Sequence, residues 1–360
     1  MECVKQQLSN YQQQLQKACH CLPFPVEQAC FFDIETTGLS ARVSSLYLLG
    51  AAYVKEGCWH LVQWFADDYV SEKEILTEFA SFLSGFHTVI HYNGSTFDIP
   101  YLEKKYQSYQ LGSPFFGKSS LDLFRQLPHK KVLFSLPDNK LTTVERFLGF
   151  HRNDTYTGKD CIRLYTDFMQ KKYFRDPLAN VDKQNLLLHN HDDLIGTILC
   201  SKLFSYLQTN HSEPYYRIEG PELILSAKLA DEVPEPLTCK KNSVQLTFKK
   251  NKLILRIPLF EGTLYHYFKD YKNYYYLPEE DMAVHKSVGA FVDASFRKKA
   301  TASNCYIKRT GTFLPLPADM KTNEITFQKS RRSSQAYLPF TEQTSLSRED
   351  CLSYLKAMTL

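Results

Sequence analysis

This chain has four carboxylates and one histidine whose spacing could bring them together in one site. Such a site could act on a phosphate ester. Asp33 and Glu35 lie two residues apart in the run Asp-Ile-Glu-Thr-Thr-Gly-Leu, and Asp98 lies in Phe-Asp-Ile-Pro. Further along, His189 and Asp193 are separated by four residues. If the fold gathers the carboxylates, they could hold two divalent metal ions beside an ionisable histidine. Such a group of residues is suited to the hydrolysis of phosphodiester bonds.

The first acidic pair lies in a segment, residues 30–35, whose pattern predicts a β-strand. Residues two apart on a strand project from the same face, so Asp33 and Glu35 should point the same way. Adjacent carboxylates repel and raise one another's pKa unless a cation lies between them. The alternative is an exposed edge strand with two solvated acids, but the neighbouring Phe31 and Phe32 argue against exposure.

Asp98 follows Asn93-Gly94, where a predicted strand over 87–91 ends, and it falls in the first turn of a predicted helix over 97–109. An acid in the first turn of a helix is stabilised by the helix dipole. That effect alone could explain this residue, so its place in a metal site depends on the surrounding motif.

His189 and Asp193 share one face of a predicted helix over 186–207, because residues four apart lie above one another. A pair at this spacing is often only a surface contact. His191 competes for the same role, but it stands two residues before Asp193 and points elsewhere, so we prefer His189. We expect Asp192 to be solvated.

The pattern along the chain predicts an α/β fold, with a mixed sheet flanked by helices and a smaller β-rich domain after it. Residues 1–27 are interpreted as a lead-in with a short Gln-rich helix, and 28–210 as the first domain. A segment with linker composition lies at 208–214. The accessory domain, 215–360, should end in a short helix. Strands are expected at 30–35, 46–54, 58–65, 87–91, 120–124, 223–227, 244–248 and 253–257, and further helices at 71–83, 141–149, 160–172 and 348–358.

Three motifs, at 33–39, 92–100 and 189–193, resemble the exonuclease motifs of the DEDD superfamily. These are ribonuclease-H-like 3′–5′ exonucleases, related to the proofreading subunit of bacterial DNA polymerase III. The resemblance covers about 28–208 and is greatest to a bacterial branch of predicted exonucleases with a histidine in the third motif. It implies a ribonuclease-H-like fold for the first domain.

The same resemblance implies a role for each matching residue. The ligands of two Mg²⁺ or Mn²⁺ ions would be Asp33, Glu35, Asp98 and Asp193, and His189 would be the general base. The terminal nucleotide would meet Thr36, Thr37, Gly38, Leu39, Asn93 and Phe97. The implied activity is metal-dependent 3′–5′ exonuclease action on single-stranded or frayed ends of DNA or RNA. Two alternatives stay open: a nucleic-acid-binding or scaffold protein with a catalytically weak domain, and an endonuclease that uses the same metals.

Charge is unevenly distributed along the 360 residues, which carry a net charge of +4. Residues 211–360 hold 22 Lys and Arg against 17 Asp and Glu, whereas residues 1–210 hold 21 against 22. This asymmetry suggests a polyanionic partner, contacted partly by the second half. Within 296–337, basic and aromatic residues are mixed as in single-strand binding surfaces. The alternative is the solvated face of a β domain, and the tyrosine-rich run 265–276 could equally be core.

The ten cysteines have no framework spacing and are interpreted as free thiols. Cys19-His20-Cys21 is too tightly spaced for a zinc site and has no second pair. The apolar runs are too short for a membrane-spanning helix, and the start lacks the layout of a signal peptide. We therefore expect a cytoplasmic protein with no membrane partner.

Overall fold

The computed structural model describes residues 1–126, 136–208, 210–341 and 345–359. The chain divides into two compact units, Met1–Ser205 and Tyr206–Leu360. Within the described residues, no helix is both long enough and apolar enough to cross a membrane.

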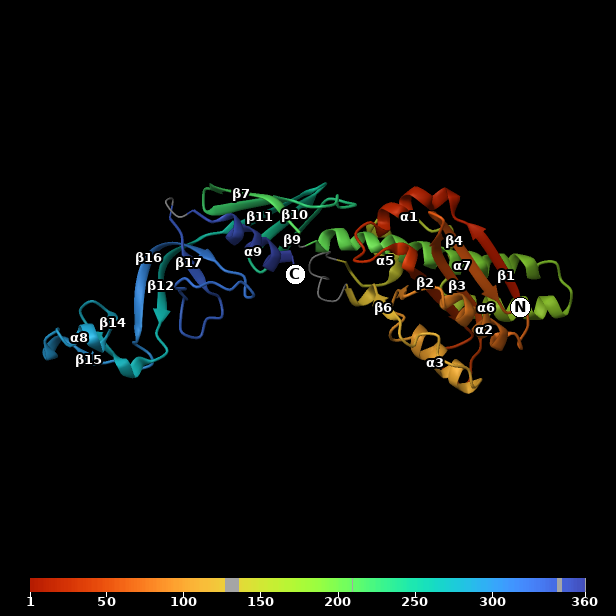
Figure 1. Cartoon of the computed structure of the whole chain (residues 1–360), viewed down its shortest axis with the longest axis horizontal. Coiled ribbons are helices and arrows are strands. Elements are labelled where there is room, and N and C mark those ends of the chain that lie inside the picture. The colour runs from red at the N-terminus through yellow and green to blue at the C-terminus, as the bar shows by residue number, and fades with distance from the viewer. Residues whose placement is uncertain (127–135, 209, 342–344, 360) are drawn as a thin grey trace. The chain divides into compact units, whose positions relative to one another are not determined.

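The first unit is built on a mixed six-stranded sheet in the order β1-β4-β3-β2-β5-β6 (Figure 1). Neighbouring strands from β1 to β2 are antiparallel, whereas β5 and β6 run parallel to β2. This is the expected α/β arrangement. The strands are β1 (Glu2–Gln7), β2 (Ala29–Thr36), β3 (Leu46–Lys55), β4 (Cys58–Phe65), β5 (Thr88–His91) and β6 (Ser119–Asp122).

Helices cover both faces of this sheet, because its central strands are apolar on both sides. On one face, the α2 residue Phe79 packs against Phe32, with ring centroids 5.7 Å apart. On the other face, α7 lies against β2 and β3, next to α1, α5 and α6. The helices are α1 (Gln12–Cys19), α2 (Glu72–Leu83), α3 (Asp98–Ser108), α5 (Leu141–Phe147), α6 (Gly158–Tyr173) and α7 (Ala179–Cys200).

The N-terminal segment, expected as a lead-in that packs on the domain or stays loose, is packed in the first unit and contributes a strand that was not expected. Residues 2–7 form β1, which pairs with β4 from Glu2 opposite Phe65 to Gln7 opposite His60. The helix α1 buries Leu15 and Ala18. The Gln-rich composition hid the strand, since β1 is an edge strand with mostly exposed side chains.

The second unit is β-rich, as expected. Its largest sheet is antiparallel, in the order β7-β8-β11-β10-β9, and two three-stranded sheets follow, β12-β16-β17 and β14-β13-β15. The helix α9 (Arg348–Thr359) lies against β7, and the short α8 (Lys286–Gly289) lies against β13 and β14. The strands are β7 (Ser212–Glu219), β8 (Glu222–Lys228), β9 (Leu237–Lys241), β10 (Val244–Lys249), β11 (Lys252–Pro258), β12 (Phe260–Tyr267), β13 (Tyr274–Leu277), β14 (Met282–His285), β15 (Lys298–Lys299), β16 (Tyr306–Pro315) and β17 (Tyr337–Pro339).

Two boundaries differ from the sequence-based expectation. The helix expected over 186–207 begins earlier, at Ala179, and its α-helical part ends at Cys200, before a 3-10 segment (Ser201–Leu207). Within the segment expected to be a linker, Ser212 already begins β7.

Candidate metal centre

Strand β2 presents Asp33 and Glu35 to α7. Alternation along the strand turns Phe32 to the opposite face, where it packs against α2. The pairing register between β2 and β3 shifts immediately after Glu35, between Glu35 and Thr36. Such irregularities end regular pairing and redirect side chains beside functional sites.

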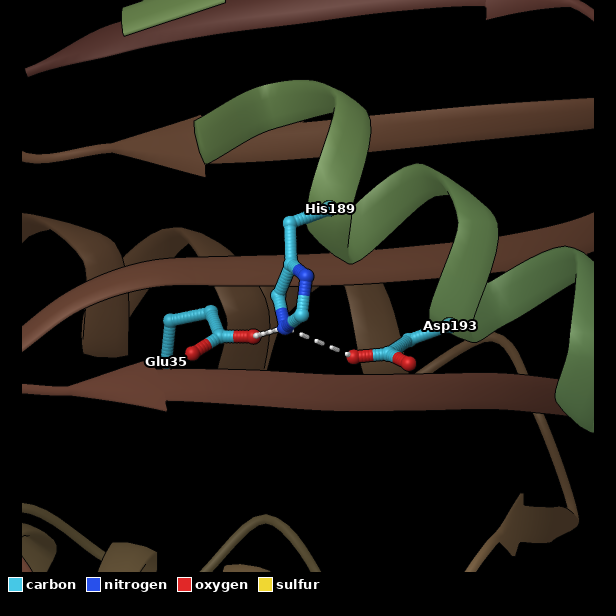
Figure 2. Close-up of side chains that lie close together, drawn as sticks. All are labelled: Glu35, His189 and Asp193. Atoms are coloured by element: carbon cyan, nitrogen blue, oxygen red, sulfur yellow. Dashed lines mark ion pairs between the residues drawn. The ribbon is translucent and has the colours of Figure 1, made fainter. Parts of the chain in front are cut away.

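His189 lies between two of the expected ligands (Figure 2). Its Nε2 atom is 3.5 Å from Oε1 of Glu35 and 3.4 Å from Oδ2 of Asp193. In the described part of the chain, these three residues form a group whose ligand atoms all lie within 4.8 Å of one another. The four-residue spacing of His189 and Asp193 on α7 therefore brings both to the end of β2, as the helical pattern predicts.

Asp33 and Asp98 are outside this triad but act on it through their charge. Asp98 is the first residue of α3, and its side chain is buried. Asp33 and Asp98 each interact electrostatically with Asp193, and Asp33 also interacts with Glu35. The structure thus groups Glu35, His189 and Asp193, with Asp33 and Asp98 within reach of their charge. The roles of Asp33 and Asp98 as metal ligands stay predictions.

Burial and mutual repulsion make these acids reluctant to ionise. Burial, together with the charge of Asp193, raises the pKa of Glu35 to about 8 and that of Asp98 to about 7. The pKa of Asp33 is also raised well above its usual range by burial and by Asp193. A buried group of oxygen donors that repel one another is a site that a hard divalent cation fits.

Burial would by itself lower the pKa of His189. A hydrogen bond with Cys161 and the charges of Asp193 and Glu35 nevertheless raise it to about 11. In the metal-free protein these contacts favour the protonated imidazole. His189 stands between Glu35 and Asp193, and its positive charge opposes the rise in the pKa of Glu35.

A carboxylate that the sequence analysis missed holds the other side of the imidazole. Oδ2 of Asp154 lies 2.5 Å from Nδ1 of His189, and Asp154 is buried. Asp192 fixes this loop by accepting hydrogen bonds from the backbone N–H groups of Asn153 and Asp154, at 2.8 and 3.0 Å. The expectation that Asp192 is solvated was wrong, because its carboxylate is fully buried and serves as the anchor of the loop.

Asn190 fixes Asp33 from α7. Its Nδ2 donates to Oδ2 of Asp33 at 2.8 Å, and its Oδ1 accepts from Nε2 of Gln63 at 2.8 Å. The contact depends on Gly50 of β3, where a Cβ atom would come within 2.0 Å of Oδ1 of Asn190. Only glycine lets α7 approach the sheet this closely.

Arg152 adds a positive charge beside the site. Its Nη2 lies 2.5 Å from Oδ1 of Asp193, and its Nε lies 2.6 Å from Oε2 of the buried Glu145. The guanidinium thus pairs with two carboxylates at once and holds Asp193 on one side. Neither Arg152 nor Asp154 belongs to a periodic pattern, so nothing but their charge marks them in the sequence.

The residues expected to contact a nucleotide lie in two loops of the first unit. In the turn after β2, the Thr36 hydroxyl donates to the carbonyl of Gly38, and the Leu39 side chain is 85% exposed. The N–H of Ser45 donates to the Thr37 hydroxyl at 2.9 Å, which closes the turn.

The second loop contains Asn93 and Phe97. Asn93 has a positive φ of 65°, and its N–H donates to Oδ1 of the buried Asp122 at 2.9 Å. The Phe97 ring lies 5.7 Å from that of Tyr101. The nucleotide-binding roles of both loops stay predictions.

Comparison with known families supports the fold. Residues 30–204 match the family model described as the RNase_H superfamily. This range includes β2 to β6 and α7, and the first unit has a ribonuclease-H-like fold. No curated protein matches the chain.

Several solved structures show a distant likeness. Exonuclease I of E. coli, solved with a dT13 oligonucleotide, is 13% identical, with a TM-score of 0.30, over 61% of this chain and 54% of that one. Exonuclease I of Methylocaldum szegediense is 16% identical, with a TM-score of 0.30, over 58% and 53%. The family B DNA polymerase of Pyrobaculum calidifontis is 12% identical, with a TM-score of 0.37, over 69% and 35%. The chain thus spans about half the length of the exonucleases and a third of the polymerase, and likenesses this slight say nothing about its activity.

Proposed function

We propose that this protein is a metal-dependent 3′–5′ exonuclease that hydrolyses phosphodiester bonds at single-stranded or frayed nucleic acid ends. The observation that carries the proposal is the cluster of His189 with Glu35 and Asp193, whose charges also act on Asp33 and on the buried Asp98. Such a cluster is costly to an apo protein and is expected where a cation will neutralise it. The polarity of the activity is inferred from the resemblance of the three motifs to DEDD exonucleases.

The ligands of two Mg²⁺ or Mn²⁺ ions would be Asp33, Glu35, Asp98 and Asp193. When bound, such ions stabilise the negative charge that develops on the phosphoryl oxygens and lower the pKa of a nearby water. The donor set is made of carboxylate oxygens, which both of these cations favour.

His189 would act as general base through Nε2. This role requires a neutral imidazole, whereas the hydrogen bond with Cys161 and the charges of Asp193 and Glu35 raise the pKa of His189 in the metal-free protein. Neutralisation of the two carboxylates would remove their part of this shift and so favour the neutral imidazole. Asp154 would hold Nδ1, so that Nε2 stays directed at the reacting water.

The test is degradation of end-labelled single-stranded DNA and RNA with Mg²⁺ or Mn²⁺. We expect stepwise shortening from the 3′ end of at least one polymer, and circular single-stranded DNA should stay intact. Cleavage of the circle would instead indicate an endonuclease. No shortening of either polymer by folded protein would refute the proposal.

One observation favours the alternative of a binding protein with weak catalysis. Arg152 already pairs with Asp193, and the His189 imidazolium stands between Glu35 and Asp193, so positive charge is present without metal. Calorimetric titration with Mn²⁺ separates the two functions. A nuclease should bind Mn²⁺ in the micromolar to millimolar range, with loss of binding in Asp33→Asn, whereas an inert domain should release no heat.

A further inference from the structure

Large apolar side chains are exposed together in the second unit, in the segment 286–299. Phe291 is 92% exposed, Val288 is 62% exposed and Phe296 is 52% exposed. Single exposed apolar residues are common, but a group of them indicates an interaction surface. The segment includes α8 and β15, which lie together with β14 at one end of this unit (Figure 1).

The same segment carries an excess of positive charge, although Arg297 acts on Asp293 and lowers the pKa of that carboxyl group. Its cations are Lys286, Arg297, Lys298 and Lys299, and its one acid is Asp293. Among the residues that the structure describes, none of the four cations forms an ion pair. Asp293 is engaged locally, since its Oδ1 accepts from the N–H of Ser295 at 2.9 Å.

Two of these cations surround an aromatic ring. The guanidinium of Arg297 lies 4.7 Å from the ring centroid of Tyr275, and Nζ of Lys286 lies 5.8 Å from it. In the strand register, Lys299 is opposite Tyr275. Charges held by cation–π contact keep their outward N–H groups available to an anion.

The segment is fixed in place although its side chains are exposed. Arg297 donates to the carbonyl of Gly289 and so ties the two ends of the loop together. The His285 side chain accepts from the N–H of Ser287 and caps α8. The exposed phenylalanines are thus held outward by an ordered loop, which lowers the entropy cost of binding.

We propose that segment 286–299 is a contact surface for single-stranded nucleic acid. The cations would neutralise successive phosphates, and Phe291 and Phe296 would stack on unpaired bases, which is the combination that sequence-independent single-strand binding uses. The proposal rests on the proposed function, because it assigns a second contact to the same substrate.

An anionic membrane would also attract cations and aromatic rings. Interfacial membrane binding usually relies on a continuous apolar helix face. Here α8 has 4 residues and the following 3-10 helix (Ala294–Phe296) has 3, so neither makes such a face. The geometry therefore favours the polynucleotide.

The test measures binding without cleavage. The full chain in EDTA is titrated against fluorescein-labelled dT20 and U20 at several salt concentrations, and fluorescence anisotropy is recorded. We expect Lys298→Glu/Lys299→Glu to weaken binding by about tenfold or more and to reduce the salt slope by about 1.4, which corresponds to two lost phosphates. Phe291→Ala/Phe296→Ala should weaken binding by about fivefold or more through lost stacking.

A matched control is Lys249→Glu/Lys250→Glu, which makes the same change of charge at the exposed end of β10 and the turn after it. The loss of oligonucleotide affinity in this control should be less than about one third of the loss in Lys298→Glu/Lys299→Glu. Equal effects at both places would overturn the proposal, because they would show only a general charge effect. All variants should keep the wild-type circular dichroism spectrum, since the substituted side chains are exposed.

A vesicle arm tests the membrane alternative. In sedimentation with phosphatidylglycerol and phosphatidylcholine vesicles, the variants of segment 286–299 should bind vesicles as the wild type does. Loss of vesicle binding with unchanged oligonucleotide binding would overturn the proposal. If the protein binds the oligonucleotide through this segment but does not cleave it, the proposed nuclease activity is refuted. The proposed binding surface is then still supported. Absence of binding by the wild type would refute the surface.

Discussion

Nδ1 of His189 lies 2.5 Å from Oδ2 of Asp154, whose side chain is 1% exposed. A buried carboxylate at this distance fixes both the orientation of the ring and the position of its proton. The opposite ring nitrogen faces Glu35 and Asp193. Through this contact, a loop that has no recognisable motif directly positions the histidine of the motif on α7.

We predict that Asp154→Asn lowers kcat by about 10–100-fold and leaves KM nearly unchanged, because it disturbs the base and not the substrate contacts. Steady-state kinetics on a labelled oligonucleotide measures both parameters. Glu78→Gln removes an exposed carboxylate on α2 and serves as control. A purely structural role for Asp154 would reduce the melting temperature and leave kcat per folded molecule unchanged.

The raised pKa values predict how stability depends on pH. Folding raises the pKa of Glu35 to about 8 and that of Asp98 to about 7, so the folded protein binds more protons than the unfolded chain above about pH 4. The raised pKa of His189 acts in the same direction above its ordinary value. The free energy of unfolding of the metal-free protein should therefore fall as pH rises from 6 to 8.

Thermal melts in EDTA at pH 6 and pH 8 test this sign, and added Mn²⁺ should raise the melting temperature more at pH 8. Glu35→Gln removes one repelling charge, so this variant should have a smaller pH dependence and a smaller response to Mn²⁺. A melting temperature in EDTA that increases from pH 6 to pH 8 would be inconsistent with these pKa shifts.

Arg152 is expected to be necessary for stability because it neutralises the buried Glu145. Arg152→Met leaves that carboxylate unpaired, which should cost about 3–5 kcal/mol in the free energy of unfolding. The double variant Glu145→Gln/Arg152→Met removes both charges and should recover much of this loss. Urea unfolding of the three proteins measures the difference. Equal destabilisation of the single and double variants would show that the ion pair is not the cause.

Because α7 lies very close to β3 at Gly50, we expect a single added methyl group there to reduce both stability and activity. In Gly50→Ala, the new Cβ would meet Oδ1 of Asn190 at 2.0 Å and Cδ1 of Leu194 at 2.7 Å. We expect a loss of about 1–3 kcal/mol in stability, together with lower activity, since Asn190 would no longer hold Asp33. Gly158→Ala is the control, because nothing lies within 4 Å of its Cβ. Similar melting temperatures for both variants would contradict this packing.

Much of the first unit could be predicted from the sequence, because its signals are local. The alternation around Asp33 and Glu35 predicts their common face, and the spacing of His189 and Asp193 predicts their contact. Asp154 and Arg152 could not be found in this way. They lie between α5 and α6, where no period governs side-chain direction, and only contacts with α7 bring them to the site. The strand β1 was missed for a related reason, since it is an edge strand with few buried residues.

The most direct test of the metal site is a single comparison of wild type with Asp33→Asn. Both proteins, shown to be folded, are incubated with Mn²⁺ and a single-stranded oligonucleotide labelled at its 5′ end, in DNA and RNA forms. We predict a ladder of products shortened one nucleotide at a time by the wild type, and at least a 100-fold slower reaction with Asp33→Asn, which corresponds to about 2.7 kcal/mol. Equal ladders from the two proteins, or none from the wild type on either polymer, would contradict the assignment of Asp33 and its neighbours as the catalytic metal centre.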